Sequence, residues 1–208
     1  MSLTPAQTVF PASARAMQDR FGSRAAYARI EERFARAVDA RLSAFLAGID
    51  SFYLATATAD AQPYVQHRGG PKGFLKVLGT TRLGFADFAG NQQYITIGRL
   101  AENDAVCLFV MDYARQARVK LWGRARVFES DAALIEQLAD PDYPARVERA
   151  IIIDIDAWSM NCHQHIPRKF DAVDVEAAIA TLENRVATLK AENAMLRDQL
   201  AGCAAPPA

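Results

Sequence analysis

The sequence predicts an α+β protein whose main domain is a six-stranded antiparallel β-barrel, preceded by helices and followed by a long C-terminal helix. Three observations lead to this fold class. Between residues 51 and 128, short apolar segments of strand length alternate with closely spaced turn residues, as in a small antiparallel barrel. Residues 13–47 carry apolar side chains at helical spacing, and residues 174–200 carry a heptad pattern. We therefore divide the chain into an N-terminal helical segment (1–48), a barrel domain (49–170) and a C-terminal coiled-coil helix (171–208).

Composition narrows the class of protein. The chain has 208 residues, 51% of them apolar, which is enough to build a sizeable core. The 24 basic and 24 acidic side chains balance, so no global charge draws the protein to nucleic acid or to an anionic membrane. No apolar stretch is long enough for a transmembrane helix, and no signal peptide is visible, so we expect a cytoplasmic protein.

The N-terminal segment is expected to hold two helices. Residues 1–12 are predicted to be irregular, and the helical spacing of residues 13–47 is interrupted at Gly22. Ser23 is a possible N-cap for the second helix, and Gly48 fits the end of that helix.

Seven segments are candidates for the strands of the barrel: 51–58, 63–67, 74–78, 83–87, 105–113, 118–128 and 150–158. The alternation of the sixth segment changes near Gly123, which predicts a β-bulge. Two short helices are expected at 91–100 and at 131–139, the second capped by Ser130 or Asp131.

The helix over 174–200 has a heptad seam. The a positions hold Ile179, Val186, Asn193 and Leu200, and the d positions hold Leu182, Leu189 and Leu196. β-Branched residues at a with leucine at d favour a parallel two-stranded coil, and one asparagine at a fixes its register. The alternative is an amphipathic helix that packs on its own domain. A zipper without a basic region in front of it does not read DNA, and residues 170–176 are acidic.

Two clusters in the barrel have the chemistry of an anion site. In residues 66–71 a strand ends in Arg68 and opens into Gly69 and Gly70, so backbone can approach a flat ligand while the guanidinium takes a phosphate. In residues 87–93 a turn leads into a helix start, where free N–H groups and the amides of Asn91 and Gln92 can bind phosphate. The alternatives are an ordinary hairpin and a capped helix without a ligand.

Two further clusters carry polar side chains. Arg118 and Lys120 point to the same face of a strand, where an anion would relieve their repulsion, although simple surface exposure explains either one alone. Residues 158–168 contain Cys162, His163 and His165, which could converge on a metal only if the chain folded back sharply, and no carboxylate motif supports such a site, so no metal site is expected. The three cysteines are widely spaced and predict neither disulfides nor zinc, and hydrolase, P-loop and dinucleotide-binding motifs are missing from the sequence.

In combination, the motifs QHRGGP, FADF-GN-QY, K-x-x-GRA and NC-x-QHIP-R make the chain similar to the pyridoxamine 5'-phosphate oxidase-like family of FMN-binding split barrels, over about residues 50–170. The resemblance implies a homodimer with FMN at the interface. It also implies an FMN site made of His67, Arg68, Gly69, Gly70, Lys76 (or Lys72), Ala86, Asp87, Gly90, Asn91, Gln92, Arg118 and Lys120, with Gln164, His165 and Arg168 from the second chain.

The chain departs from the family pattern at three places. Gly-Asn-Gln at 90–92 stands where the oxidase has Ser-Arg-Lys, which leaves Arg68, Arg118 and Lys120 to hold the phosphate, and Arg118 falls where the oxidase has a glutamine near the flavin ring. The predicted coil replaces the C-terminal substrate-binding segment of the oxidase. The resemblance therefore supports the cofactor more than the vitamin B6 substrate.

Three functional hypotheses follow. The first is a homodimeric FMN-dependent oxidoreductase that acts on a small molecule, with no assigned catalytic residue, although His67 or His165 has suitable acid–base chemistry. The second is a non-enzymatic module that binds or senses flavin or haem, with His163 and His165 as candidate axial ligands. The third is a scaffold whose role is the C-terminal coil.

Overall fold

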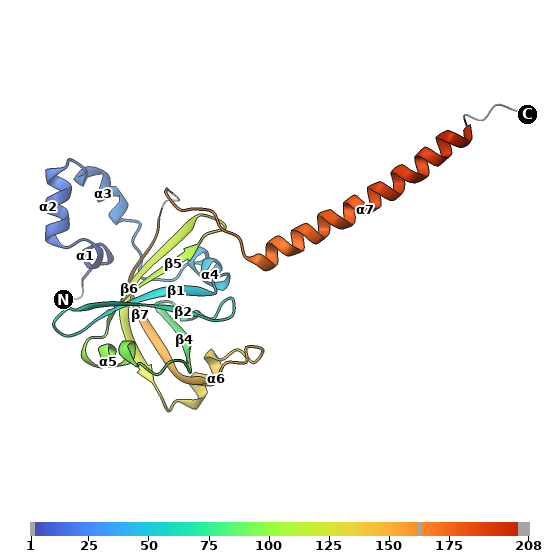
Figure 1. Ribbon diagram of the computed structural model, residues 1–208. Coiled ribbons are helices and arrows are strands. Elements are labelled where there is room, and N and C mark those ends of the chain that lie inside the picture. Colours follow the sequence, from blue (N-terminus) through green and yellow to red (C-terminus); the bar gives the residue numbers. More distant parts are fainter. Residues whose placement is uncertain (1–2, 162–163, 204–208) are drawn as a thin grey trace, which may run out of the picture. The chain divides into compact units, whose positions relative to one another are not determined.

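The computed structural model describes residues 3–161 and 164–203. The chain divides into two compact units, Met1–Ile166 and Pro167–Ala208. The first unit holds an antiparallel sheet with helices around it, and the second holds one long helix (Figure 1).

Within the described residues the first unit forms seven strands rather than the predicted six. They are β1 (Ser51–Ala57), β2 (Pro63–Gly69), β3 (Lys76–Gly79), β4 (Arg82–Phe88), β5 (Ala105–Asp112), β6 (Ala117–Phe128) and β7 (Val147–Asn161). All neighbours are antiparallel, in the order β2-β1-β5-β6-β7-β4-β3. All seven candidate segments form strands, so the predicted count of six was one too low, and β3 is a four-residue edge strand that pairs only with β4. The sheet coils into a split barrel, so β2 and β3 are its two edges.

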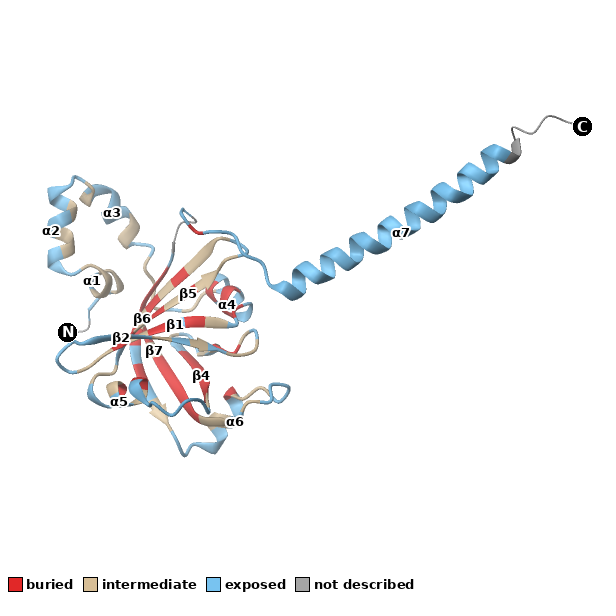
Figure 2. Cartoon of the chain, in the orientation of Figure 1, coloured by how far each residue is buried: buried red, intermediate tan, exposed pale blue. Residues whose placement is uncertain are grey.

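The core lies inside the barrel, where alternate residues of each strand point inward. Phe52 and Leu54 of β1, Leu108 of β5, and Leu121 of β6 are at most 1% exposed. Helix α4 (Ala40–Ala47) adds Leu42, Phe45 and Leu46 to the same cluster. Burial of each such side chain contributes about 1.5–3 kcal/mol, so this core is the main source of the barrel's stability. Figure 2 shows the buried residues concentrated in the strands.

The bulge predicted near Gly123 is confirmed. The register between β6 and β7 shifts between Trp122 and Gly123. A Cβ atom at residue 123 would lie 2.3 Å from the carbonyl oxygen of Asp154, a distance that no side chain tolerates. The bulge therefore requires glycine, because a side chain at residue 123 would collide with the backbone of β7.

The prediction for the N-terminal segment was wrong in two respects. Residues expected to be irregular include helix α1 (Pro5–Val9), which is started by a capping box between Thr4 and Gln7 and by proline at its first position. Three helices follow instead of two: α2 (Ala12–Arg20), α3 (Arg24–Glu31) and α4.

Residue 35 explains the additional break. The backbone of Ala35 pairs with Trp158 of β7, and the two N···O distances are 3.2 and 2.7 Å. Helix cannot continue through a residue that hydrogen-bonds as a strand, so α3 ends before Ala35 and α4 begins after it. Ser23, the expected cap, makes no side-chain capping bond, whereas Gly48 is at the C-cap of α4 as predicted.

Two short helices flank the sheet. Helix α5 (Ile95–Glu102) begins four residues later than the sequence predicts, because Gln92 and Tyr94 adopt left-handed backbone angles, with φ of 56° and 52°. Helix α6 (Ala132–Leu138) confirms the prediction, including its cap, since the Asp131 carboxylate accepts a hydrogen bond from the Leu134 N–H.

The second unit is helix α7 (Ala172–Cys203). Helix α7 is coloured as exposed along its described length (Figure 2). The exposed residues include the apolar members of the heptad seam: Ile179, Leu182, Val186, Leu189, Leu196 and Leu200. None of the helices in the described residues is both long enough and apolar enough to cross a bilayer. The two-stranded coil stays a prediction.

Candidate functional site

A polar pocket of about 240 Å³ lies on the inner side of the barrel, where the sheet is split. The pocket is formed by strands β2 and β4, the start of β7, the loop before α5 and the first turn of α5. Its lining residues are Tyr64, Gln66, Arg68, Asp87, Phe88, Gly90, Asn91, Gln92, Gln93, Tyr94, Ile95, Thr96, Ile97, Glu148 and Arg149. The pocket thus unites the two predicted anion-binding clusters.

Arg68, Asp87 and Arg149 form the charged centre of this pocket. Arg68 points inward because it pairs with Phe52, a residue of the buried face of β1. The Asp87 carboxylate accepts a hydrogen bond from Nη1 of Arg68 and another, at 3.3 Å, from Nη1 of Arg149. Because Arg68 lies on edge strand β2 and Asp87 on β4, this ion pair closes the gap in the barrel.

Burial governs the protonation of this centre. Asp87 is only 5% exposed. Burial raises the pKa of the Asp87 carboxyl above its ordinary value, while the charges of Arg68 and Arg149 act against that rise. A buried carboxylate that has lost its guanidinium partners would therefore take up a proton readily.

The two guanidinium groups are not fully paired by protein. Within the described residues, Nε of Arg68 and Nε of Arg149 are buried and have no hydrogen-bond partner. Buried N–H donors of charged groups are normally satisfied, and a ligand with acceptor oxygens in this pocket would satisfy these two atoms.

The loop before α5 gives the pocket its other donors. The Asn91 side chain accepts from the Gln93 N–H at 3.2 Å, which fixes a turn. In the part of the chain that the structure describes, no side chain caps α5 at Tyr94, so the first-turn N–H groups are open to a ligand. Helix α5 is tied to the edge strand because the Thr96 hydroxyl donates to Gln66 Oε1 at 2.5 Å.

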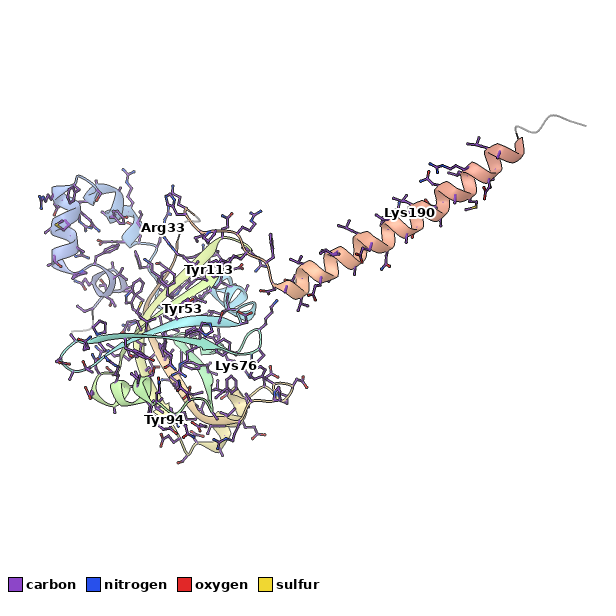
Figure 3. The ribbon with its side chains drawn as sticks, viewed as in Figure 1. Arg33, Tyr53, Lys76, Tyr94, Tyr113 and Lys190 are labelled. Atoms are coloured by element: carbon purple, nitrogen blue, oxygen red, sulfur yellow. The ribbon has the colours of Figure 1, made fainter. Side chains whose placement is uncertain are left out.

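Tyr94 covers one side of the pocket. Its ring centroid lies 5.2 Å from the guanidinium carbon of Arg149, a cation–π distance. The side chain is half exposed, and Figure 3 labels it beside α5. Tyr94 is at the N-cap of α5 with a left-handed backbone, at φ 52°.

Other predicted residues lie on the opposite, outer face of the sheet. Strand pairing aligns His67, Tyr53, Phe109, Lys120 and Ser159 in one row across β2, β1, β5, β6 and β7. The rings of His67 and Tyr53 are 5.7 Å apart. This row, together with Arg118, is the outer-face cluster. The structure separates it from Arg68, because residues 67 and 68 alternate sides.

Lys120 is a partly buried base in the outer-face cluster. Burial lowers the pKa of its ammonium group, and the nearby Arg118 charge lowers that pKa further. The Nζ atom lies 5.6 Å from the ring centroid of Trp122. Nε of Arg118 is buried and lacks a hydrogen-bond partner among the described residues. The cluster is therefore a second place suited to an anionic or electron-rich ligand.

Several predicted site residues do not line the polar pocket. Lys76 donates to the carbonyl oxygens of Gln137 and Ala139 at 3.1 and 3.0 Å, where it neutralises the C-terminal end of α6. Ala86 is buried in the small apolar cluster with Leu138.

The glycines and the last segment also lie elsewhere. Gly70 leaves room for Phe74, since a Cβ there would be 2.8 Å from that ring. Gly69 lines a smaller cavity of about 170 Å³ with His67 and Arg68. Gln164, His165 and Arg168 are exposed after β7.

No trio of His, Cys, Asp or Glu able to hold a metal ion occurs within residues 3–161 and 164–203. Cys162 and His163, which the sequence offers as metal or haem ligands, lie outside the described residues.

Sequence reasoning missed Arg149, Tyr94 and Thr96 as pocket residues, and it included Gln66 in the first cluster without giving it a role. The signal for Arg149 was a basic residue that directly precedes the apolar run Ala150–Ile153 of a buried strand. A charge at that place needs a buried partner, and Asp87 supplies it from a strand 62 residues away.

A sequence model of the pyridoxamine 5'-phosphate oxidase family matches residues 38–162, more than half of the chain. The chain belongs to this family. The matched residues include the barrel strands and all residues that line the polar pocket. The pocket therefore lies within the family's domain. Among proteins with curated descriptions, none matches the chain.

Solved structures also resemble this member of the pyridoxamine 5'-phosphate oxidase family. A putative pyridoxamine 5'-phosphate oxidase from Lactobacillus delbrueckii shares 21% identity, with a TM-score of 0.46 over 60% of this chain and 94% of the other. HupZ from Group A Streptococcus shares 12% identity, with a TM-score of 0.48 over 64% of this chain and 99% of the other. A protein described as F420 reductase shares 19% identity, with a TM-score of 0.41 over 60% of this chain and 98% of the other.

Proposed function

We propose that this chain is an FMN-binding oxidoreductase of the pyridoxamine 5'-phosphate oxidase family, which acts on a small molecule as a homodimer. The observation that carries the proposal is the polar pocket, where Arg68 and the uncapped first turn of α5 converge on one space. Guanidinium groups and helix N-termini are the two devices that proteins use most for phosphate.

The residues present fit the phosphate end of FMN. The unpartnered Nε atom of Arg68, the amides of Asn91 and Gln92, and the backbone N–H groups of α5 are all donors, as a phosphate requires. A volume of about 240 Å³ accommodates a phosphate with part of the attached chain, so the flavin ring would extend beyond the pocket.

The outer-face cluster supports the chemistry of the proposal. FMN, when bound, supplies hydride or electron transfer. Arg118 and Lys120 carry positive charge that would stabilise an anionic reduced ring, but within one chain the sheet separates them from the phosphate pocket. They would therefore act on a flavin ring that reaches the outer face, as at an interface between two chains, where the lowered pKa of Lys120 makes its proton easier to release than that of an ordinary lysine.

The homodimer is proposed from α7 and the residues before it. The heptad seam of α7 is exposed over its length and suits a second copy of the same helix. Gln164, His165 and Arg168 are exposed as well, and we assign them to the FMN site of the partner chain, as the family resemblance implies.

A visible absorbance spectrum of the purified full chain, repeated on the supernatant after heat denaturation, tests the cofactor. We expect the two bands of oxidised flavin and release of FMN into the supernatant. Arg68→Gln should remove the bound flavin, whereas Arg126→Gln, an exposed arginine on β6, should retain it. A colourless protein that takes up no added FMN refutes the proposal, and a Soret band without flavin bands favours the haem-binding alternative.

A further inference from the structure

Arg149 is a buried cation that no sequence motif assigns to the pocket. It is 9% exposed, and its side chain enters the pocket from the start of β7. Nη1 binds Asp87 at 3.3 Å and Nη2 binds Glu148 at 3.0 Å. Nε has no hydrogen-bond partner in the described residues, and the nearest carboxylate oxygen recorded for it, on Glu129, is 3.8 Å away.

The charges of the pocket explain why a second cation matters. Gly90, Asn91 and Gln92 bring no positive charge to the loop before α5. Among the described lining residues, Arg68 and Arg149 are the two cations, while Asp87 and Glu148 are the two anions. The pocket is therefore close to neutral as it stands. A phosphate binds well only if it takes over guanidinium bonds that carboxylates now hold.

Asp87 has the position of such a competitor. Its two oxygens accept from Arg68 and from Arg149, so one carboxylate spans both guanidinium groups. A phosphate oxygen between the same two groups would make the same kind of charge-assisted bond. Burial also favours the neutral form of Asp87, which reduces its hold on the arginines when a second anion is near.

We propose that Arg149 is the second guanidinium of the phosphate site and that Asp87 competes with the phosphate for Arg68 and Arg149. This inference rests on the proposed function, since it names which residues of the same pocket set the affinity for the phosphate of FMN. The competing explanation is structural: Arg149 ties β7 to β4 and to the Tyr94 ring, and contributes nothing to binding.

Comparing FMN with riboflavin separates the two explanations, because riboflavin has the same ring without the phosphate. The full chain, freed of bound flavin, is titrated with each ligand by flavin fluorescence. Arg149→Gln should raise the Kd for FMN about tenfold or more and leave the Kd for riboflavin unchanged. The matched control is Arg146→Gln, which removes an exposed arginine that also pairs with Glu148. It should change neither Kd.

Asp87→Asn provides a second variant with the opposite expected sign. It keeps the shape of the side chain and removes the competing charge, so FMN should bind severalfold more tightly while riboflavin is unaffected. An unchanged FMN affinity in Arg149→Gln, or an equal loss of both ligands, refutes the role of Arg149. Weaker FMN binding by Asp87→Asn refutes the competition.

Failure of the proposed function would look different. If the wild-type chain binds neither flavin, thermal unfolding with inorganic phosphate and pyrophosphate tests the site alone. An anion-dependent rise in Tm that Arg149→Gln abolishes and Arg146→Gln retains keeps the inference while FMN is rejected. No such rise in the wild type rejects both.

Discussion

The barrel strands and helix α7 both carry regular apolar patterns, but only the apolar residues of the strands are buried within the chain. In β6 the alternation places Val119, Leu121 and Ala125 inside the barrel, each at most 2% exposed. In α7 the seam residues Ile179 and Leu189 are 49% and 40% exposed. An alternating strand finds its partners in its own sheet, whereas a heptad seam is complete only when a second helix covers it. A regular apolar pattern therefore predicts burial, but not the molecule that provides it.

The largest expected effect is in the barrel core. Leu121→Ala should lower the free energy of unfolding by about 2–5 kcal/mol, because it leaves a cavity in a fully buried cluster. Urea denaturation measures the change. Val65→Ala on the outer face of β2, where the side chain is 57% exposed, is the control and should have a much smaller effect. Equal effects would mean that the core does not carry the stability of the barrel.

A substitution in the seam of α7 should change the oligomeric state of the protein and not the stability of the barrel. Leu189→Asp puts a charge at a d position, so we expect dissociation of the coil at micromolar concentration and loss of helical circular dichroism, with the unfolding of the barrel unchanged. Light scattering after size-exclusion chromatography measures the mass. Ala191→Asp introduces the same charge at an f position away from the seam and should preserve assembly. If the two variants show the same mass and helicity, the seam is not the interface between chains.

A smaller effect is expected from ion pairs on the outside of the barrel. Arg82 of β4 and Arg126 of β6 donate to Asp154 of β7 at 2.7 and 2.9 Å. Burial alone would raise the pKa of Asp154, but the two hydrogen bonds more than offset it, so that pKa lies below its ordinary value. Because the pKa is lower in the folded state, the stabilisation is present above pH of about 4 and is lost as the pH falls through the folded-state pKa.

Asp154→Asn tests this contribution. The variant should lose a small amount of stability at neutral pH and show a shallower fall of Tm below pH of about 4. Parallel Tm profiles for wild type and variant across the acid range would contradict it. A small effect of Asp154→Asn would mean that apolar burial supplies most of the barrel's stability and ion pairs add little. Helix α7, by contrast, has no buried apolar face of its own within the described chain.

Local patterns in the sequence predicted most of the barrel. The strands, the bulge at Gly123 and the cap at Asp131 each depend on residues close in the chain, and the structure confirms them. The N-terminal helices were harder to predict, because Ala35 leaves helical geometry to pair with Trp158, which is 123 residues later. The start of α5 was missed because Gln92 and Tyr94 adopt left-handed angles without the glycine that usually signals them.

The candidate site was predicted less well for the same physical reason. Arg68 and the loop at 90–92 were visible because strand ends and helix starts have local signatures. The contact between Asp87 and Arg149 joins two strands far apart in sequence, and no local pattern encodes it. Which face of the sheet a residue occupies also depends on its strand partners, so Arg118 and Lys120 were grouped with Arg68 although the sheet separates them.

The two tryptophans of the chain give its N-terminal segment an optical reporter. Trp158 is 2% exposed, and its indole N–H donates to the Ala37 carbonyl at 2.8 Å. Trp122 is only half buried, and its ring lies 6.4 Å from that of Phe34, which follows α3. In a Trp158→Phe protein, the emission of Trp122 would shift to the red when residues around Phe34 leave the sheet. Fluorescence can thus follow the detachment of the N-terminal segment while the barrel is still folded.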